Sequence, residues 1–251
     1  NRSSSFRILG LMAISFVQNL ALYSTPGRGG TTSHSAPLSA TPTSGNLMIA
    51  HLNAYPTSSI TITATGWTEI SFTQSSHSLI QFLYRISDGT ETSLDFTTSG
   101  NVQYVKNVNE FSGVDTSSPI ASSSLVHDIE PSPNPARSTW STGTHASTPD
   151  TAALVRFLAT SNGGFVTTSA PTGHVSLGYI EGLVIASWAL QESPYTAGDN
   201  GTSVSVDTEF PRREISTLNI GLREAGGSSA GSALSAAHLA NAIRLQSNYK
   251  R

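Results

Sequence analysis

The chain has 251 residues, of which 37% are hydrophobic and only 12% are charged, about half the charged share of an average soluble domain. The absence of cysteine excludes disulfides and thiolate metal sites, and the formal charge of −3 without a basic stripe excludes an electrostatic nucleic-acid binder. This length suits one large all-β domain or two smaller ones.

Residues 1–12 combine Arg2 and Arg7 with an apolar run that starts at Ile8, an order that resembles the beginning of a secretory signal. We interpret this segment as an N-terminal arm that leads into the first strand, and Phe6 and Ile8 as its candidate contacts with a partner. No apolar run reaches the roughly 18 residues of a membrane-spanning helix, so we expect no membrane span.

Short apolar or alternating runs with turn signals between them predict antiparallel strands throughout residues 13–225. In "LIQFLYRI", for example, Ile80, Phe82 and Tyr84 share one face of the strand. No amphipathic helix is indicated before residue 230, and the sequence therefore predicts an all-β body. The predicted strands are residues 13–18, 46–54, 59–63, 68–74, 79–87, 92–97, 102–111, 120–128, 151–160, 174–180, 183–191, 202–207 and 215–222.

A proline-rich loop, residues 128–149, separates two strand-rich halves that echo each other weakly. "GNLMIAHLNA" resembles "DTAALVRFLA", "LIQFLYRISDGTETSLDF" resembles "LVIASWALQESPYTAGDNGTSVSV", and "VQYVKNVNEFSG" resembles "ISTLNIGLREAG". Two such half-sets of strands facing each other would form one two-sheet antiparallel jelly-roll-like sandwich with a shared core.

The C-terminal region departs from the strand pattern. Residues 226–232, "GGSSAGS", have the composition of a flexible linker, and residues 233–251 are rich in Ala and Leu without Pro or Gly. We expect a helical tail there, with Leu239 and Ile243 on one apolar stripe and Leu245 nearby. Because an isolated helix of this length is marginal in water, it should dock on a partner subunit or on its own sandwich.

The segment "GVDTSSPI", residues 113–120, predicts a sharp corner. Gly113 permits an abrupt exit from its strand, Asp115 can accept backbone N–H groups of the turn, and Pro119 prevents the strand ladder from continuing. We expect the chain to pass here from one sheet to another.

This corner also belongs to an ordered set of motifs, "PTSGNLMIAHLNA", "GWTEI", "LYRISDGTE", "FSGVDTSSPI" and "GTSVSV…LNIGLREA". Together they resemble the jelly-roll-like β-sandwich proteins of bacteriophage virions and of bacterial surface or secreted proteins. The resemblance covers residues 13–225 and implies a structural or adhesive module, without catalytic residues to carry over.

Few residues suggest chemistry. The histidines form no metal-binding pair, Asp128 and Glu130 read as solvated charges more readily than as cation ligands, and "GSSAG" at 227–231 lacks the parallel sheet that a nucleophile elbow needs. We therefore expect no catalytic residue, metal site or cofactor. Trp188 is expected in the core, whereas Trp140 and Tyr195, in loops, are candidates for stacking on a glycan.

The favoured hypothesis is a non-enzymatic structural virion protein on the capsid surface, most specifically a phage capsid decoration or cement protein. It would contact the capsid shell or neighbouring virion subunits through residues 1–12 and 226–251, as a homo-oligomer for which we expect a trimer. The alternative is a carbohydrate-binding adhesin or receptor-binding module, extracellular, on a tail fibre or cell surface.

Overall fold

The computed structural model describes residues 13–24, 32–56, 60–75, 78–129, 139–161, 165, 169–182, 185–207 and 214–226. Every regular element in this part of the chain is a β-strand, and all strand pairs are antiparallel, which confirms the predicted all-β class. The strands are β1 (Ser15–Ser24), β2 (Ser33–Pro37), β3 (Leu47–Pro56), β4 (Ile62–Thr63), β5 (Thr68–Gln74), β6 (Leu79–Ile86), β7 (Ser93–Thr98), β8 (Val102–Ser112), β9 (Ile120–Ile129), β10 (Thr139–Ser141), β11 (Thr151–Ser161), β12 (His174–Glu181), β13 (Ile185–Glu192), β14 (Ser205–Asp207) and β15 (Glu214–Arg223).

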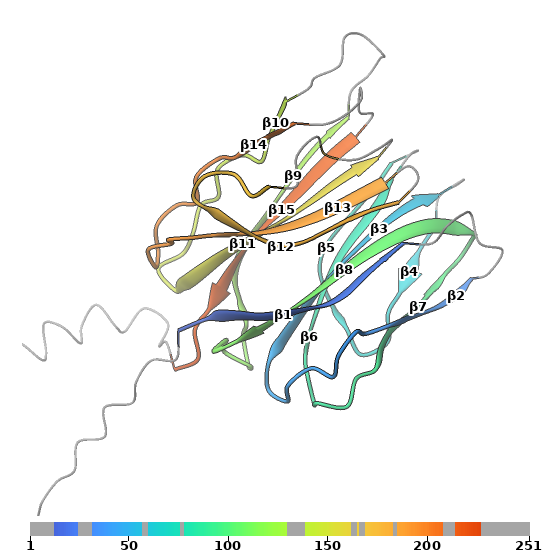
Figure 1. Cartoon of the computed structure of the whole chain (residues 1–251), viewed down its shortest axis with the longest axis horizontal. Helices are drawn as coiled ribbons and strands as arrows, with labels where there is room; N and C mark the ends of the chain where they lie inside the picture. The colour runs from blue at the N-terminus through green and yellow to red at the C-terminus, as the bar shows by residue number, and fades with distance from the viewer. Residues whose placement is uncertain are drawn as a thin grey trace, which may run out of the picture.

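Two five-stranded sheets form the centre of the molecule (Figure 1). Their strand orders are β1-β8-β3-β6-β5 and β12-β13-β11-β15-β9, and they pack face to face over a shared apolar core. In this core the alternation predicted for β6 is confirmed, because Ile80 and Phe82 are buried and Tyr84 packs against them. Leu218, Ile220 and Leu222 of β15 contribute to the same core from the opposite sheet.

Each central sheet also has an apolar outer face, and a small sheet covers it. Met48 and Leu52 of β3 point away from the shared core, toward the three-stranded sheet β2-β7-β4. Leu158 of β11 and Trp188 of β13 do the same toward the two-stranded sheet β10-β14. The strands are apolar on both faces, so two layers cannot bury them, and the molecule has four layers where the sequence predicted two.

The two halves of the chain share one strand order. When β1, β8, β3, β6 and β5 are matched with β9, β15, β11, β13 and β12, the two central sheets have the same sequence of neighbours. β2 and β7 correspond in the same way to β10 and β14. The three pairs of segments that echo each other in sequence thus lie at equivalent places in the two sheets.

The corner at residues 113–120 leads from β8 in one central sheet to β9 in the other, as predicted. Gly113 has a φ of 74°, a conformation that favours glycine. The Asp115 carboxylate accepts backbone N–H groups of Ser117 at 2.8 Å and Ser118 at 3.2 Å, which holds the turn.

Two strands were missed by the sequence analysis. β2 is short and polar in sequence, and β10 lies inside the segment 128–149 that we expected to be a loop; it pairs with β14 through Trp140 opposite Val206. The arm 1–12, the remainder of the linker, 227–232, and the tail 233–251 lie outside the described residues.

Candidate functional site

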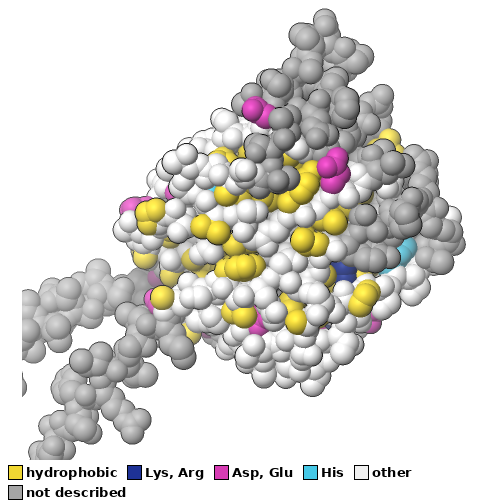
Figure 2. Space-filling model, in the orientation of Figure 1, with side chains coloured by type: hydrophobic (Ala, Val, Ile, Leu, Met, Phe, Trp, Pro, Cys, Tyr) yellow, Lys and Arg dark blue, Asp and Glu magenta, His cyan; other side chains and the backbone are white. Residues whose placement is uncertain are grey.

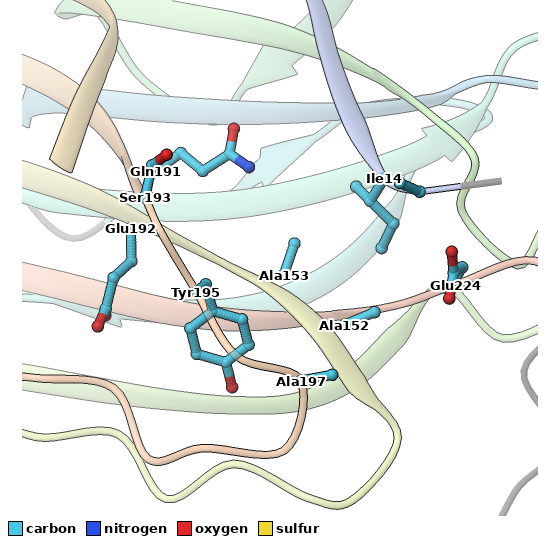
Figure 3. Close-up of a pocket in the computed structure, with 10 residues that line it drawn as sticks. Ile14, Ala152, Ala153, Gln191, Glu192, Ser193, Tyr195, Ala197 and Glu224 are labelled. Carbon is cyan, nitrogen blue, oxygen red and sulfur yellow. The ribbon is translucent and has the colours of Figure 1, made fainter. Parts of the chain in front are cut away.

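A pocket of about 290 Å³ lies at one end of the sandwich, which we call the pole pocket (Figure 3). One wall is apolar: Ile14, which precedes β1, points toward Ala153 of β11. Glu224, next to the end of β15, stands beside Ile14 at the rim, and Tyr195 belongs to the loop after β13. Because Ala13 and Glu224 both line this pocket, the described chain begins and ends at the same pole.

Behind the pole pocket lies a buried charged network centred on Arg156 of β11, whose side chain is fully buried. Its Nη2 donates to Glu192 Oε2 at 2.9 Å and to the Thr202 carbonyl at 2.5 Å, while Nη1 donates to Asn219 Oδ1. Burial lowers the pKa of the guanidinium, and the ion pair with Glu192 opposes that shift. His174 Nε2 lies 4.0 Å from the same carboxylate, and burial lowers the pKa of this imidazole.

Gly201 lets the loop that follows β13 approach this network closely. A Cβ atom at that position would lie 2.1 Å from Leu154 Cδ2 and 2.8 Å from Arg156 Nη2, distances that no real contact has. The same loop is fastened by Tyr195, whose hydroxyl lies 2.5 Å from the Asp199 carbonyl oxygen and 2.8 Å from Ser147 Oγ. Glu192 of this network and Tyr195 of this loop both line the pole pocket, which links the pocket to the network. The sequence analysis missed the network.

Histidine and serine side chains form hydrogen bonds in the interior, in geometries typical of structural contacts between strands. His145 Nε2 contacts Ser122 Oγ at 2.9 Å and its Nδ1 contacts Ser124 Oγ at 2.7 Å, so both ring nitrogens face hydroxyls. His51 Nδ1 contacts Ser187 Oγ at 2.6 Å between the two central sheets. Both imidazoles are buried, and a triad would place a carboxylate on the nitrogen opposite the serine. These pairs tie strands together.

A second candidate surface is the edge where β1 and β12 pack side by side, one from each central sheet, which we call the β1–β12 edge. It exposes three large hydrophobic side chains: Val17 (42%), Leu22 (42%) and Val175 (49%). β1 contains neither a charged residue nor a proline. Figure 2 shows hydrophobic side chains over this face of the molecule and very few Lys or Arg side chains.

The predicted site residues fall into three groups. Phe6, Ile8, Leu239, Ile243 and Leu245 lie outside the described residues. Tyr195 is half-buried and lines the pole pocket. Trp188 is fully buried, as predicted.

The expectation that Trp140 is exposed was wrong, because it is 8% exposed. The indole packs in the core under β10, and its Nε1 donates to Thr217 Oγ1 at 3.4 Å. The ring lies in a proline-rich segment but is buried, because this segment pairs with β14.

Within the described ranges, no group of three or more His, Cys, Asp or Glu side chains is placed to hold a metal ion. The described residues also contain no helix long and apolar enough to cross a membrane.

Comparisons of the chain with protein-family models, with curated proteins and with solved structures found no significant match. They add no support to the resemblance noted from the motifs, and the connection with virion and surface proteins stays a prediction.

Proposed function

We propose that this protein is a non-enzymatic structural subunit that assembles with copies of itself, and most specifically a capsid decoration protein of a bacteriophage, located on the virion surface. The β1–β12 edge is the observation that carries the proposal. It places Val17, Leu22 and Val175, three of the four large hydrophobic side chains that are exposed in the described part of the chain, on two adjacent edge strands.

Edge strands attract other strands, because outward N–H and C=O groups without a partner can pair with them. On β1 the Leu20 carbonyl already accepts the Ser39 N–H, so this edge is covered at that residue. Proteins usually protect such edges with lysine, proline or very short strands, and the ten-residue β1 has none of these. A second copy of the chain suits this edge, because the uncharged β1 strands of two copies can meet without repulsion between like charges. Strands of this length, in sheets about 10 Å apart, offer on the order of 600 Å² per partner, near the lower limit of stable interfaces.

The proposal includes a finer description of the fold. In the first half, strands β1, β8, β3 and β6 lie in one sheet and β2, β7 and β4 in the sheet that faces it, so the chain crosses between two sheets repeatedly. This order supports a jelly-roll unit, and the matching order of the second half supports another, joined to the first through the shared core. Jelly rolls serve as capsid and lectin domains.

The test measures the mass of the full-length chain in solution by light scattering, at concentrations of about 1 to 100 μM. This range suits a modest interface, because a binding free energy of about 8 kcal/mol corresponds to a Kd of about 1 μM. We expect an oligomer that the double variant Val17→Lys/Val175→Lys converts to a monomer. The matched control is Phe72→Lys, since Phe72 is exposed to 40% on β5 at the opposite edge of its sheet. A monomeric wild type, or equal effects of both variants, would contradict the assembly proposal.

The measured mass also distinguishes the trimer expected from the sequence from a two-fold dimer. Binding to the virion is tested separately, by co-sedimentation of the tagged chain with phage particles from the strain that carries its gene. Absence of the chain from those particles would contradict the capsid assignment and leave the self-assembly result standing.

A carbohydrate-binding adhesin is the second candidate, because Tyr195 presents an aromatic ring at the pole pocket next to Gln191 and Ser193. Tyrosine beside amide and hydroxyl groups is a combination that binds sugars through stacking and hydrogen bonds. A glycan array with the wild type and Tyr195→Ala tests this function: specific binding that the variant loses supports the adhesin, and no binding by the wild type contradicts it.

A further inference from the structure

The charges of this chain are unevenly distributed. All sixteen acidic residues lie between Glu69 and Glu224, whereas five of the thirteen Lys and Arg residues lie in the terminal segments 1–12 and 227–251. Those five are Arg2, Arg7, Arg244, Lys250 and Arg251. The rest of the chain contains the other eight basic residues and all sixteen acidic ones, so this body carries a formal charge of −8 and the terminal segments together carry +5. The termini and the body therefore attract each other.

The pole pocket combines apolar walls with a carboxylate that is not engaged. Ile14, Ala152 and Ala153 supply aliphatic surface, and Gln191 extends its amide along the opposite side (Figure 3). Glu224 makes no side-chain hydrogen bond or ion pair with any residue in the described part of the chain. A ligand for this pocket needs an aliphatic portion and a positive charge close together, which is the chemistry of a basic, apolar peptide segment.

The C-terminal segment has this chemistry and starts near the pocket. Leu239 and Ile243 are spaced by four residues, Arg244 follows directly, and residues 233–251 contain no acidic residue. The described chain ends at Gly226, two residues after Glu224. A Gly/Ser-rich segment as long as 226–232 spans roughly 15 Å when it is a coil, which would be enough to reverse direction and return to the pocket.

Linkage in one chain favours docking within the same copy. A short linker of Gly/Ser composition would give the tethered segment an effective concentration on the order of millimolar at its own pocket, which a neighbouring copy reaches only in a dense assembly. The N-terminal segment is a weaker competitor, since Ala13 and Ile14 already form the rim and no Gly/Ser linker of comparable length separates them from residues 1–12.

We propose that the pole pocket is a binding site for a basic, apolar peptide segment, and that its occupant is the C-terminal segment 233–251 of the same chain. Leu239 and Ile243 lie against the wall formed by Ile14 and Ala153, and Arg244 pairs with Glu224. This inference concerns a single copy and holds whether or not the β1–β12 edge assembles.

A photo-crosslinker in the pocket identifies the occupant. The full-length chain carries benzoylphenylalanine in place of Ala197, which is exposed and lines the pocket. It is prepared with ¹⁴N and with ¹⁵N, mixed in equal amounts, irradiated and analysed by mass spectrometry. We expect the pocket peptide to be crosslinked to a peptide from residues 233–251. The two crosslinked peptides should carry the same nitrogen isotope, because they come from one chain. Mixed-isotope pairs, crosslinks to residues 1–12, or no crosslink to 233–251 would each overturn the proposal.

Charge exchange tests the pairing with Glu224. Glu224→Lys and Arg244→Glu should each lower the yield of that crosslink about two- to five-fold, the range of a partly exposed ion pair, and the double variant should restore it. Arg244 follows the last strand of the sandwich in the sequence, so we expect its replacement to leave the body intact and to separate lost docking from lost folding. The control is Glu181→Lys, an exposed carboxylate at the far end of β12 from His174. Equal losses with the control, or no restoration in the double variant, would refute the pairing.

Discussion

Acid should destabilise this protein through His51, the histidine between the two central sheets. Its side chain is fully buried, stacks on Phe82 with 4.6 Å between ring centroids, and contacts Ser187 Oγ at 2.6 Å through Nδ1. Burial lowers the pKa of His51 from 6.5 to about 3. Below pH 6.5 the His51 imidazole is therefore protonated in the unfolded chain, whereas in the folded chain it stays neutral until the pH falls to about 3.

The direction and size of the effect follow from this difference. The folded pKa is depressed, so the contribution of His51 is complete above pH 6.5 and is lost as the pH falls toward 3. Each pH unit in that window costs about 1.4 kcal/mol. Between pH 7 and pH 5, the wild type should lose roughly 2 kcal/mol through this group alone.

Urea unfolding of the full-length chain at pH 7 and pH 5, followed by tryptophan fluorescence, measures the loss. The variant His51→Gln should lose about 2 kcal/mol less than the wild type over the same interval, whatever its stability at pH 7. The control Ser187→Ala removes the hydrogen-bond partner and keeps the titrating ring, so its pH dependence should stay close to that of the wild type. Equal pH dependence with and without His51 would refute the assignment.

Three further predictions concern stability. Gly178→Ala should destabilise the fold by about 1–3 kcal/mol in the same unfolding assay, because Gly178 has a φ of 150° and a Cβ atom there would lie 2.5 Å from Asn19 Nδ2; an unchanged midpoint would contradict this reading. Arg156→Met should cost about 3–5 kcal/mol by leaving the Glu192 carboxylate buried without its partner, and adding Glu192→Leu should recover part of that loss. Trp140→Ala should cost about 3–5 kcal/mol, the penalty of a core aromatic, whereas a loss below 1 kcal/mol would indicate a surface ring after all.

The sequence alone determined the class of the fold and much of its order, because the signals involved are local. The alternation of apolar residues in β6 located that strand and the face that it turns to the shared core. The corner at 113–120 needs only a glycine, an aspartate and a proline at fixed spacing, and these already indicate a change of sheet. The weak echo between the halves pointed to strands that turned out to have equivalent neighbours.

The tertiary structure decided what depends on contacts between distant segments. β10 forms only because β14 lies beside it, and that pairing buries Trp140, which its polar, proline-rich surroundings place in a loop. The one sequence signal for the network behind the pole pocket was a lone arginine in the apolar run "TAALVRFLAT". The role of this arginine, Arg156, becomes clear only from the fold, which places the Glu192 carboxylate, 36 residues away in sequence, 2.9 Å from the guanidinium. A buried charge is tolerated only when its partner is in place, and that placement is a property of the packed sheets.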